Sequence, residues 1–194
     1  MKAAAEGGAK VIVAAGFMQA TALTKAAAEF TDVKFVFVDR DSAVTTEDGT
    51  ALKNVLGICF QEEQCGYLAG YAVVKEGYTK LGFTGGGGGD NPACCRYGYG
   101  FVQGADAAAV EMGIADQVVM EYAYGNQFYG DSDITAYMDN WYQTLGVEVV
   151  FASGGGIYTS AVEAALKNNG YVIGVDVDPV SYTHLRAHET RRHL

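Results

Sequence analysis

The sequence has few positive charges, few prolines and few histidines. Its 194 residues include 13 lysines and arginines against 23 aspartates and glutamates, which gives a net charge of −10. Nucleic-acid binding needs a basic surface, so this balance argues against that function, and it argues equally against a polybasic membrane-binding surface. The sequence also lacks any run of about 18 apolar residues, so we expect no membrane-spanning helix. An apolar fraction of 49% indicates a folded globular chain.

Histidine is confined to the end of the chain. All three histidines, His184, His188 and His193, lie among the last eleven residues. The rest of the chain has no histidine for a catalytic triad or a zinc site, no G-x-S-x-G nucleophile motif and no Gly-Lys pair of a phosphate loop. We therefore expect no enzyme activity, no metal site and no cofactor.

The four cysteines leave the redox compartment open. Cys59, Cys65, Cys94 and Cys95 contain no C-x-x-C spacing, and a disulfide between adjacent cysteines is strained. We expect Cys59 and Cys65 to be buried as small apolar side chains.

Short β-branched runs alternate with longer helical patterns along the chain. Strands are predicted at residues 10–15, 34–38, 54–60, 80–84, 117–123, 147–152 and 171–175, and helices at 20–30, 62–75, 93–112, 132–145 and 159–167. Continuous apolar strands separated by helices are typical of a parallel sheet covered on both faces. The predicted fold class is therefore α/β. Gly100 and Gly104 would permit close packing of the longest helix.

The pattern restarts after a polar, glycine-containing stretch at residues 76–79. We predict a first lobe at residues 1–79 and a second lobe at residues 80–178. The first lobe has only three predicted strands, and residues 1–5 resemble the end of a helix, so we expect the chain to begin inside a domain. Residues 179–194 are basic, unlike the rest, and we expect them to lie outside the fold.

Residues that follow the strands are the candidate ligand contacts, because ligands of parallel sheets bind beyond the carboxyl ends of the strands. These residues are polar, aromatic or glycine, at 16–18, 39–41, 61–63, 85–91, 124–128, 153–158 and 176–178. The glycine runs at 85–89 and 154–156 do not fit G-x-G-x-x-G, since the sixth residue of the motif, where its last glycine should stand, is never glycine. Such a set suits a small polar ligand, although any α/β protein has similar residues at its strand ends.

Four segments carry a more specific pattern. They are N-V-L-G-I-C-F-Q-E-E-Q-C-G-Y-L-A-G at 54–70, L-G-F-T-G-G at 81–86, R-Y-G-Y-G-F-V-Q-G at 96–104 and V-I-G-V-D-V-D at 172–178. In order and spacing they resemble the BMP (basic membrane protein) family of purine-nucleoside receptor lipoproteins. The resemblance covers residues 3 to 178. It implies a type I periplasmic-binding-protein-like fold, with two doubly wound parallel-sheet lobes that close on a ligand.

The resemblance also implies site residues. Phe128 corresponds to the aromatic residue that stacks on the base, although a core aromatic of the following helix is the alternative. Asp176 corresponds to the carboxylate that accepts hydrogen bonds from the ribose hydroxyls. Glu62 corresponds to an acidic residue that contacts the base. The turn whose backbone lies against the ligand corresponds to Gly154, Gly155 and Gly156.

The same resemblance implies the biological setting. Members of the family are substrate-binding components of ABC transporters, so we expect a purine nucleoside or similar ligand and an ABC permease as partners. The longer parent protein would lie outside the cytoplasm, attached to the plasma membrane as a lipoprotein. A sugar receptor of the same fold is one alternative. A nucleoside- or sugar-processing enzyme of doubly wound fold is another, and the lack of catalytic groups argues against it.

The sequence departs from the family at both ends. The opening strand of the family, and the loop after it that contacts the ligand, have no counterpart here, and residues 179–194 match nothing in the family. These last residues resemble translated sequencing-adapter read-through. We therefore expect a chain truncated at both ends, in which the 194 residues alone bind ligand weakly or not at all.

Overall fold

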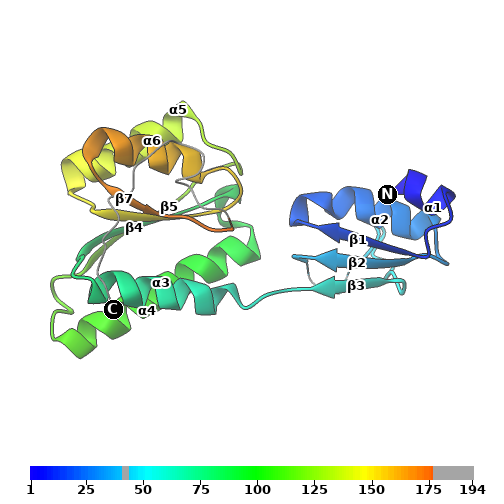
Figure 1. Ribbon diagram of the computed structural model, residues 1–194, viewed down its shortest axis with the longest axis horizontal. Helices are drawn as coiled ribbons and strands as arrows, with labels where there is room; N and C mark the ends of the chain where they lie inside the picture. Colours follow the sequence, from blue (N-terminus) through cyan, green and yellow to red (C-terminus); the bar gives the residue numbers. More distant parts are fainter. Residues whose placement is uncertain (41–43, 177–194) are drawn as a thin grey trace, which may run out of the picture. The chain divides into compact units, whose positions relative to one another are not determined.

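The computed structural model describes residues 1–40 and 44–176, which fold as two compact units (Figure 1). The first unit comprises Met1–Phe60, and the second begins at Gln61. The structure places this division at residues 60 and 61 rather than at 79 and 80. The reason is helix α3, Glu62–Lys75, which packs along helix α4, Pro92–Met112, and buries Val73 and Val74 in the core of the second unit. Residues 179–194, predicted to lie outside the fold, are not among the described residues.

The first unit is a three-stranded parallel sheet with helices on one face. Strands β1 (Val11–Ala15), β2 (Lys34–Val38) and β3 (Val55–Ile58) pair in that order. Helices α1 (Lys2–Glu6) and α2 (Ala20–Glu29) cover the face that carries Ile12, Phe35 and Phe37. A short 3-10 turn, η1 at Phe17–Gln19, joins β1 to α2. The helix predicted from residues 1–5 is therefore confirmed as α1.

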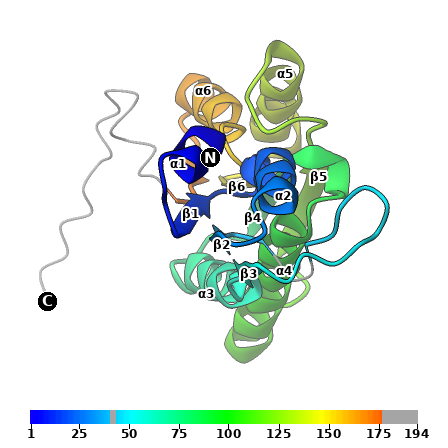
Figure 2. The same ribbon diagram turned by 90° about the vertical axis from the view of Figure 1, so that its right-hand side faces the viewer.

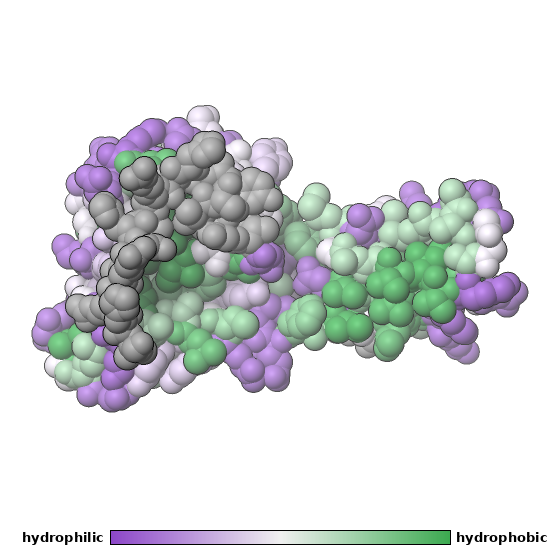
Figure 3. Space-filling model, in the orientation of Figure 1, coloured by the Kyte–Doolittle hydropathy of each residue, from purple (hydrophilic) through white to green (hydrophobic). Residues whose placement is uncertain are grey.

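The opposite face of this sheet is bare, so the prediction of a sheet covered on both faces is wrong for the first unit. Val11, Val13 and Leu56 are 57%, 65% and 59% exposed, and the burial of β1 alternates strictly along the strand. Alternation arises because successive side chains of a strand point to opposite faces, and the described helices of this unit cover only one of them. Figure 3 shows apolar surface over this unit.

The second unit has a four-stranded parallel sheet with helices on both faces. Its strands are β4 (Lys80–Gly85), β5 (Val119–Tyr124), β6 (Val149–Ser153) and β7 (Tyr171–Ile173), in the spatial order β5-β4-β6-β7. Helices α3 and α4 cover one face, and helices α5 (Ser132–Asn140) and α6 (Tyr158–Asn168) cover the other (Figure 1). The expected α/β architecture is confirmed here, and the β4 strand is buried on both sides.

Helices α3 and α4 pack backbone against backbone. A Cβ atom added to Gly100 would overlap the carbonyl of Glu63, and one added to Gly104 would overlap that of Tyr67. Gly66 and Gly70 of α3 meet α4 carbonyls in the same way. The close packing predicted for Gly100 and Gly104 is thus confirmed, and it depends on glycine in both helices.

Some local predictions differ from the structure. The helix predicted at 132–145 changes at Asn140 into a π-helical turn, η3 at Trp141–Leu145, and β7 ends at Ile173 instead of residue 175. Cys59 and Cys65 are exposed, so their predicted burial is wrong: Cys59 follows β3, and Cys65 lies next to Gly66, away from the α4 contact. Within residues 1–40 and 44–176, no helix is long and apolar enough to cross a membrane.

Candidate functional site

Three loops of the second unit meet at the carboxyl ends of its strands. The loop after β4 donates hydrogen bonds to both of its neighbours, because Gly86 N donates to Ser153 O at 2.9 Å and Gly88 N donates to Gly125 O at 2.7 Å. The loop after β5 is bonded in turn to the loop after β6, since Gly156 N donates to Phe128 O at 2.7 Å. Main-chain hydrogen bonds therefore join all three loops into one surface.

Glycine is required where these loops touch. Gly154 has a φ of 125°, and a Cβ atom there would lie 2.7 Å from Gly86 N. Gly155 has a φ of 56°, and its Cβ atom would lie 2.6 Å from Phe128 O. Any other residue would be strained in its backbone and would collide with a neighbouring loop. The predicted glycine turn is therefore adjacent to the predicted aromatic residue.

The Phe128 ring packs against the backbone of two glycines, Gly86 and Gly87. It packs against the loop after β4 so closely that a Cβ atom at Gly86 would lie 2.7 Å from Phe128 Cδ1. Gly87 meets the same ring and has a φ of 73°. Phe128 is half-buried and precedes α5, and it is not a member of the core clusters of buried residues. One side of the ring is thus supported by backbone.

Asp131 fixes the loop that carries Phe128. Its Oδ1 accepts the Ile134 N–H at 2.8 Å and caps α5, while its Oδ2 accepts a hydrogen bond from the Gln127 side chain. The Asp131 N–H donates to Ser160 Oγ at 2.9 Å, which ties the loop to α6. Sequence reasoning missed this residue. An aspartate directly before a predicted helix is a standard N-cap and could have indicated it.

Asp176 follows β7 and adopts an unusual backbone conformation. Its φ is 67°, in the left-handed region that residues other than glycine seldom occupy, and its side chain is exposed. Such strain is concentrated at functional sites. Because β7 lies next to β6, Asp176 comes to the same edge of the sheet as the glycine turn at 154–156. Asp178 lies outside the described residues.

Glu62 lies at the start of α3, where its carboxylate is buried. Its side chain is only 4% exposed, and its Oε2 accepts the Arg96 Nε–H at 2.5 Å. Arg96 also lies 3.8 Å from Glu63 Oε2. In the structure Glu62 therefore joins α3 to α4 through an ion pair in which its own carboxylate is buried and Arg96 is partly exposed. The described contacts do not join it to Phe128 or to the glycine turn.

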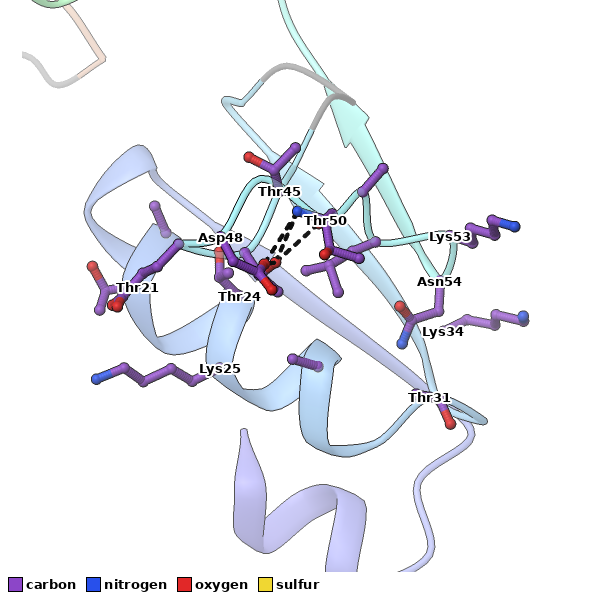
Figure 4. Close-up of a pocket in the computed structure, with 16 residues that line it drawn as sticks. Thr21, Thr24, Lys25, Thr31, Lys34, Thr45, Asp48, Thr50, Lys53 and Asn54 are labelled. Carbon is purple, nitrogen blue, oxygen red and sulfur yellow. Dashed lines mark hydrogen bonds between the residues drawn. The ribbon is translucent and has the colours of Figure 1, made fainter.

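A larger hollow lies elsewhere, in the first unit. It has a volume of about 1020 Å³ and runs between α2 and residues 45–54 (Figure 4). Lys34 and Asn54, which line it, stand where β2 and β3 begin, so the hollow borders the amino ends of these strands. The Asp48 carboxylate in its wall accepts hydrogen bonds from Thr46 and from the Thr50 N–H. A smaller hollow of about 460 Å³ adjoins Gln127 and Asp131 in the second unit.

Known proteins resemble this chain over most of its length. Residues 1–187 match the family model described as "ABC transporter substrate-binding protein PnrA-like". Basic membrane protein B of Borreliella afzelii is 32% identical over 174 residues, which are 88% of this chain and 48% of that protein. The chain therefore spans about half the length of the curated relatives it matches.

Two solved structures show the same fold. An ABC transporter solute-binding protein from Aeropyrum pernix K1 has a TM-score of 0.68 at 23% identity, over 94% of this chain and 50% of that one. The Caulobacter myo-inositol binding protein has a TM-score of 0.55 at 20% identity, over 92% of this chain and 60% of that one. At these identities the likeness concerns the fold alone, and it confirms the expected periplasmic-binding-protein-like architecture.

Proposed function

Because the chain belongs to the family of PnrA-like ABC transporter substrate-binding proteins, we propose that it forms part of a receptor that captures a purine nucleoside or a similar small polar molecule. In this proposal the ligand binds between two lobes whose closure excludes water, and the closed form presents it to an ABC permease. The parent protein would act outside the cytoplasm, attached to the plasma membrane as a lipoprotein. The ligand leaves unchanged, so no catalytic group is required.

The observation that carries the proposal is the support of Phe128. Glycine backbone from the loop after β4 packs against the Phe128 ring, and the Phe128 carbonyl accepts a hydrogen bond from Gly156 N. An aromatic ring held in this way has a fixed orientation, and stacking of a planar base on such a ring contributes about 1–3 kcal/mol per base.

The remaining predicted contacts have separate roles in this proposal. Asp176 is exposed at the same edge of the sheet, where an ionised carboxylate can accept hydrogen bonds from two ribose hydroxyls. The backbone of Gly154, Gly155 and Gly156 lies next to Phe128 and can approach a ligand closely for lack of side chains. The contact between Glu62 and the base stays a prediction, second to its ion pair with Arg96.

Calorimetry tests the ligand class. A version of the protein extended to the length of its relatives is titrated with guanosine, adenosine, inosine and ribose. We expect nucleoside binding, and we expect the Phe128→Ala variant to bind the nucleoside about tenfold more weakly or worse, because stacking is lost. Tyr129→Ala, which removes an exposed aromatic side chain from the adjacent position, is the matched control and should leave the affinity unchanged.

Two results would contradict the proposal. Binding of ribose but of no nucleoside would show that the ligand is a sugar, and an unchanged affinity of Phe128→Ala would remove the stacking role. The 194-residue chain itself should bind nucleosides weakly or not at all, since it covers about half the length of its relatives. Tight nucleoside binding by this chain would refute that expectation.

A further inference from the structure

We propose that a second hollow of the second unit, between α4 and the outer side of β5, binds a small organic cation of the alkylammonium type. This hollow has a volume of about 480 Å³ and is lined by side chains from two elements. From α4 come Cys95, Arg96, Tyr99 and Val102, and from β5 come Tyr122 and Tyr124.

The spacing of these residues explains why they converge. Cys95, Tyr99 and Val102 recur at helical intervals and share one face of α4. Tyr122 and Tyr124 alternate along β5 and share one face of that strand. Strand β5 is the edge of the four-stranded sheet, as Figure 2 shows at the right of the second unit, so no further described strand covers its outer side.

The tyrosine rings of β5 are fixed before any ligand arrives. The Tyr122 ring packs 4.7 Å from Phe83, and its hydroxyl lies 2.8 Å from the hydroxyl of Tyr124. Gly98 of α4 makes room for the Tyr122 hydroxyl, because a Cβ atom at Gly98 would overlap it. Tyr99, 64% exposed, stands on the helix side of the hollow. A preorganised set of aromatic rings loses little conformational freedom on binding.

The charges around the hollow favour a cation. Residues 61–176 contain four lysines and arginines against fourteen aspartates and glutamates. Arg96 is the only formal cation in the lining, and two carboxylates, those of Glu62 and Glu63, lie within 4 Å of its Nε. An oxygen of Glu63 is also buried without a hydrogen-bond partner in the described part of the chain. A lobe of this charge attracts positive solutes and repels anions.

The lining also selects an organic cation over a metal ion. Its polar atoms apart from Arg96 are a thiol and phenol groups, and burial raises the pKa of Tyr122 and of Tyr124, so both phenols stay neutral at physiological pH. Neutral phenols and a thiol are poor ligands for hard metal ions. The faces of tyrosine rings attract alkylammonium groups through their quadrupoles, and Val102 adds apolar contact.

Titration of the full 194-residue chain with choline tests the proposal. The trimethylammonium protons are followed by NMR, because aromatic rings shift the resonance of a bound methyl group. The comparison ligand is 3,3-dimethylbutan-1-ol, which has the same shape without the charge. We expect saturable choline binding in the millimolar range and at least about threefold weaker binding of the neutral alcohol, in line with an exposed cation–π contact.

Variants localise the binding. Tyr99→Leu removes a ring from an exposed position, so the protein should fold, and choline should bind about threefold or more weakly. Tyr99→Phe keeps the ring and should retain the affinity, which separates ring attraction from hydrogen bonding. Tyr137→Leu removes a tyrosine that is 52% exposed on α5 and should change nothing.

Several outcomes would overturn the proposal. They are equal affinity for the neutral alcohol, no saturation by choline, loss of binding in Tyr99→Phe, and equal weakening by Tyr137→Leu. The result is independent of the nucleoside proposal: Phe128→Ala should leave choline binding unchanged, and guanosine should not displace choline. A failure to bind nucleosides would therefore not affect this test.

Discussion

Asp131 connects the local structure of one residue to the presentation of another. Asp131 caps α5, accepts a hydrogen bond from the Gln127 side chain and donates its N–H to Ser160 Oγ. Phe128 lies between Gln127 and Asp131 in the chain. The geometry of the aromatic residue thus depends on a carboxylate three positions away. Positioning of this kind reduces the cost of ordering a loop when a ligand binds.

The two tasks of Asp131 can be separated by substitution. Asp131→Ala removes both the cap and the Gln127 contact, and we expect a loss of about 1–2 kcal/mol in the free energy of unfolding in urea. Asp131→Ser keeps a capping oxygen but loses the contact with Gln127. It should unfold within about 1 kcal/mol of the parent, while hydrogen exchange at residues 126–129 becomes faster.

Ser132→Ala is the control for this pair, because it alters the next residue of the same helix. It should change neither stability nor exchange by a measurable amount. If exchange at residues 126–129 is equally slow in Asp131→Ser and in the parent, the Gln127 contact does not hold the loop.

At the scale of residues, the sequence indicates some of the candidate site residues but not the long-range contacts that position them. Gly154 to Gly156 and Phe128 could be predicted from motif resemblance, and the structure brings them into contact. The capping role of Asp131 could be predicted from its place before the helix, but its hydrogen bond to Ser160 on α6 could not, because the two residues are distant in the chain. The pairing of Glu62 with Arg96 was hidden for the same reason, since 34 residues separate them.

At the scale of elements, the crossing of α3 and α4 is tightly constrained. Glycines of each helix face carbonyl groups of the other, so neither helix can move away without losing contact or move closer without overlap. The helices α3 and α4 therefore behave as one layer. This layer is also the reason that the first unit ends at Phe60.

Gly104→Ala tests the crossing by the sign of its effect. In an ordinary helix interior, replacing glycine with alanine stabilises by about 1 kcal/mol. Here the added Cβ would overlap the Tyr67 carbonyl, so we expect a loss of about 1–3 kcal/mol in urea unfolding. Gln103→Ala, one residue earlier on the exposed face, should stay within about 0.5 kcal/mol. A stabilised Gly104→Ala variant would show that the helices are not in close contact.

The elements themselves were largely predictable from hydrophobic periodicity. The predicted helix at 62–75 coincides with α3, and the predicted strand at 34–38 coincides with β2. The π-helical turn after Asn140 was not predictable, because Trp141 is drawn into the core against Gly82. Tertiary packing overrides local pattern at such ends.

At the scale of the whole molecule, the first unit differs from the second in what covers its sheet. Val13, Val36 and Leu56 lie side by side across the three strands, and the described helices leave their face open. Periodicity identified the strands and the fold class. It could not show which faces are covered, because that depends on the number of helices available to each sheet.

A bare apolar face predicts self-association of the 194-residue chain. Val13→Thr combined with Leu56→Thr keeps β-branched or β-compatible side chains but makes the face polar. We expect sedimentation velocity to show less association for this double variant than for the parent at the same concentration. Val119→Thr, at a 51% exposed position of the second unit, is the control and should associate as the parent does. A parent that stays monomeric at high concentration would contradict this expectation.

The three loops at the carboxyl ends of β4, β5 and β6 are joined to each other by peptide groups, and peptide groups do not titrate in the physiological range. The main chain of these three loops therefore keeps the same hydrogen-bond donors and acceptors at any pH at which the protein is folded. Any pH dependence of ligand binding would therefore arise from side chains beside these loops and not from the main chain of the loops. Substitution of the side chains beside these loops would likewise change the ligand preference and leave the hydrogen-bonded main chain of the loops intact.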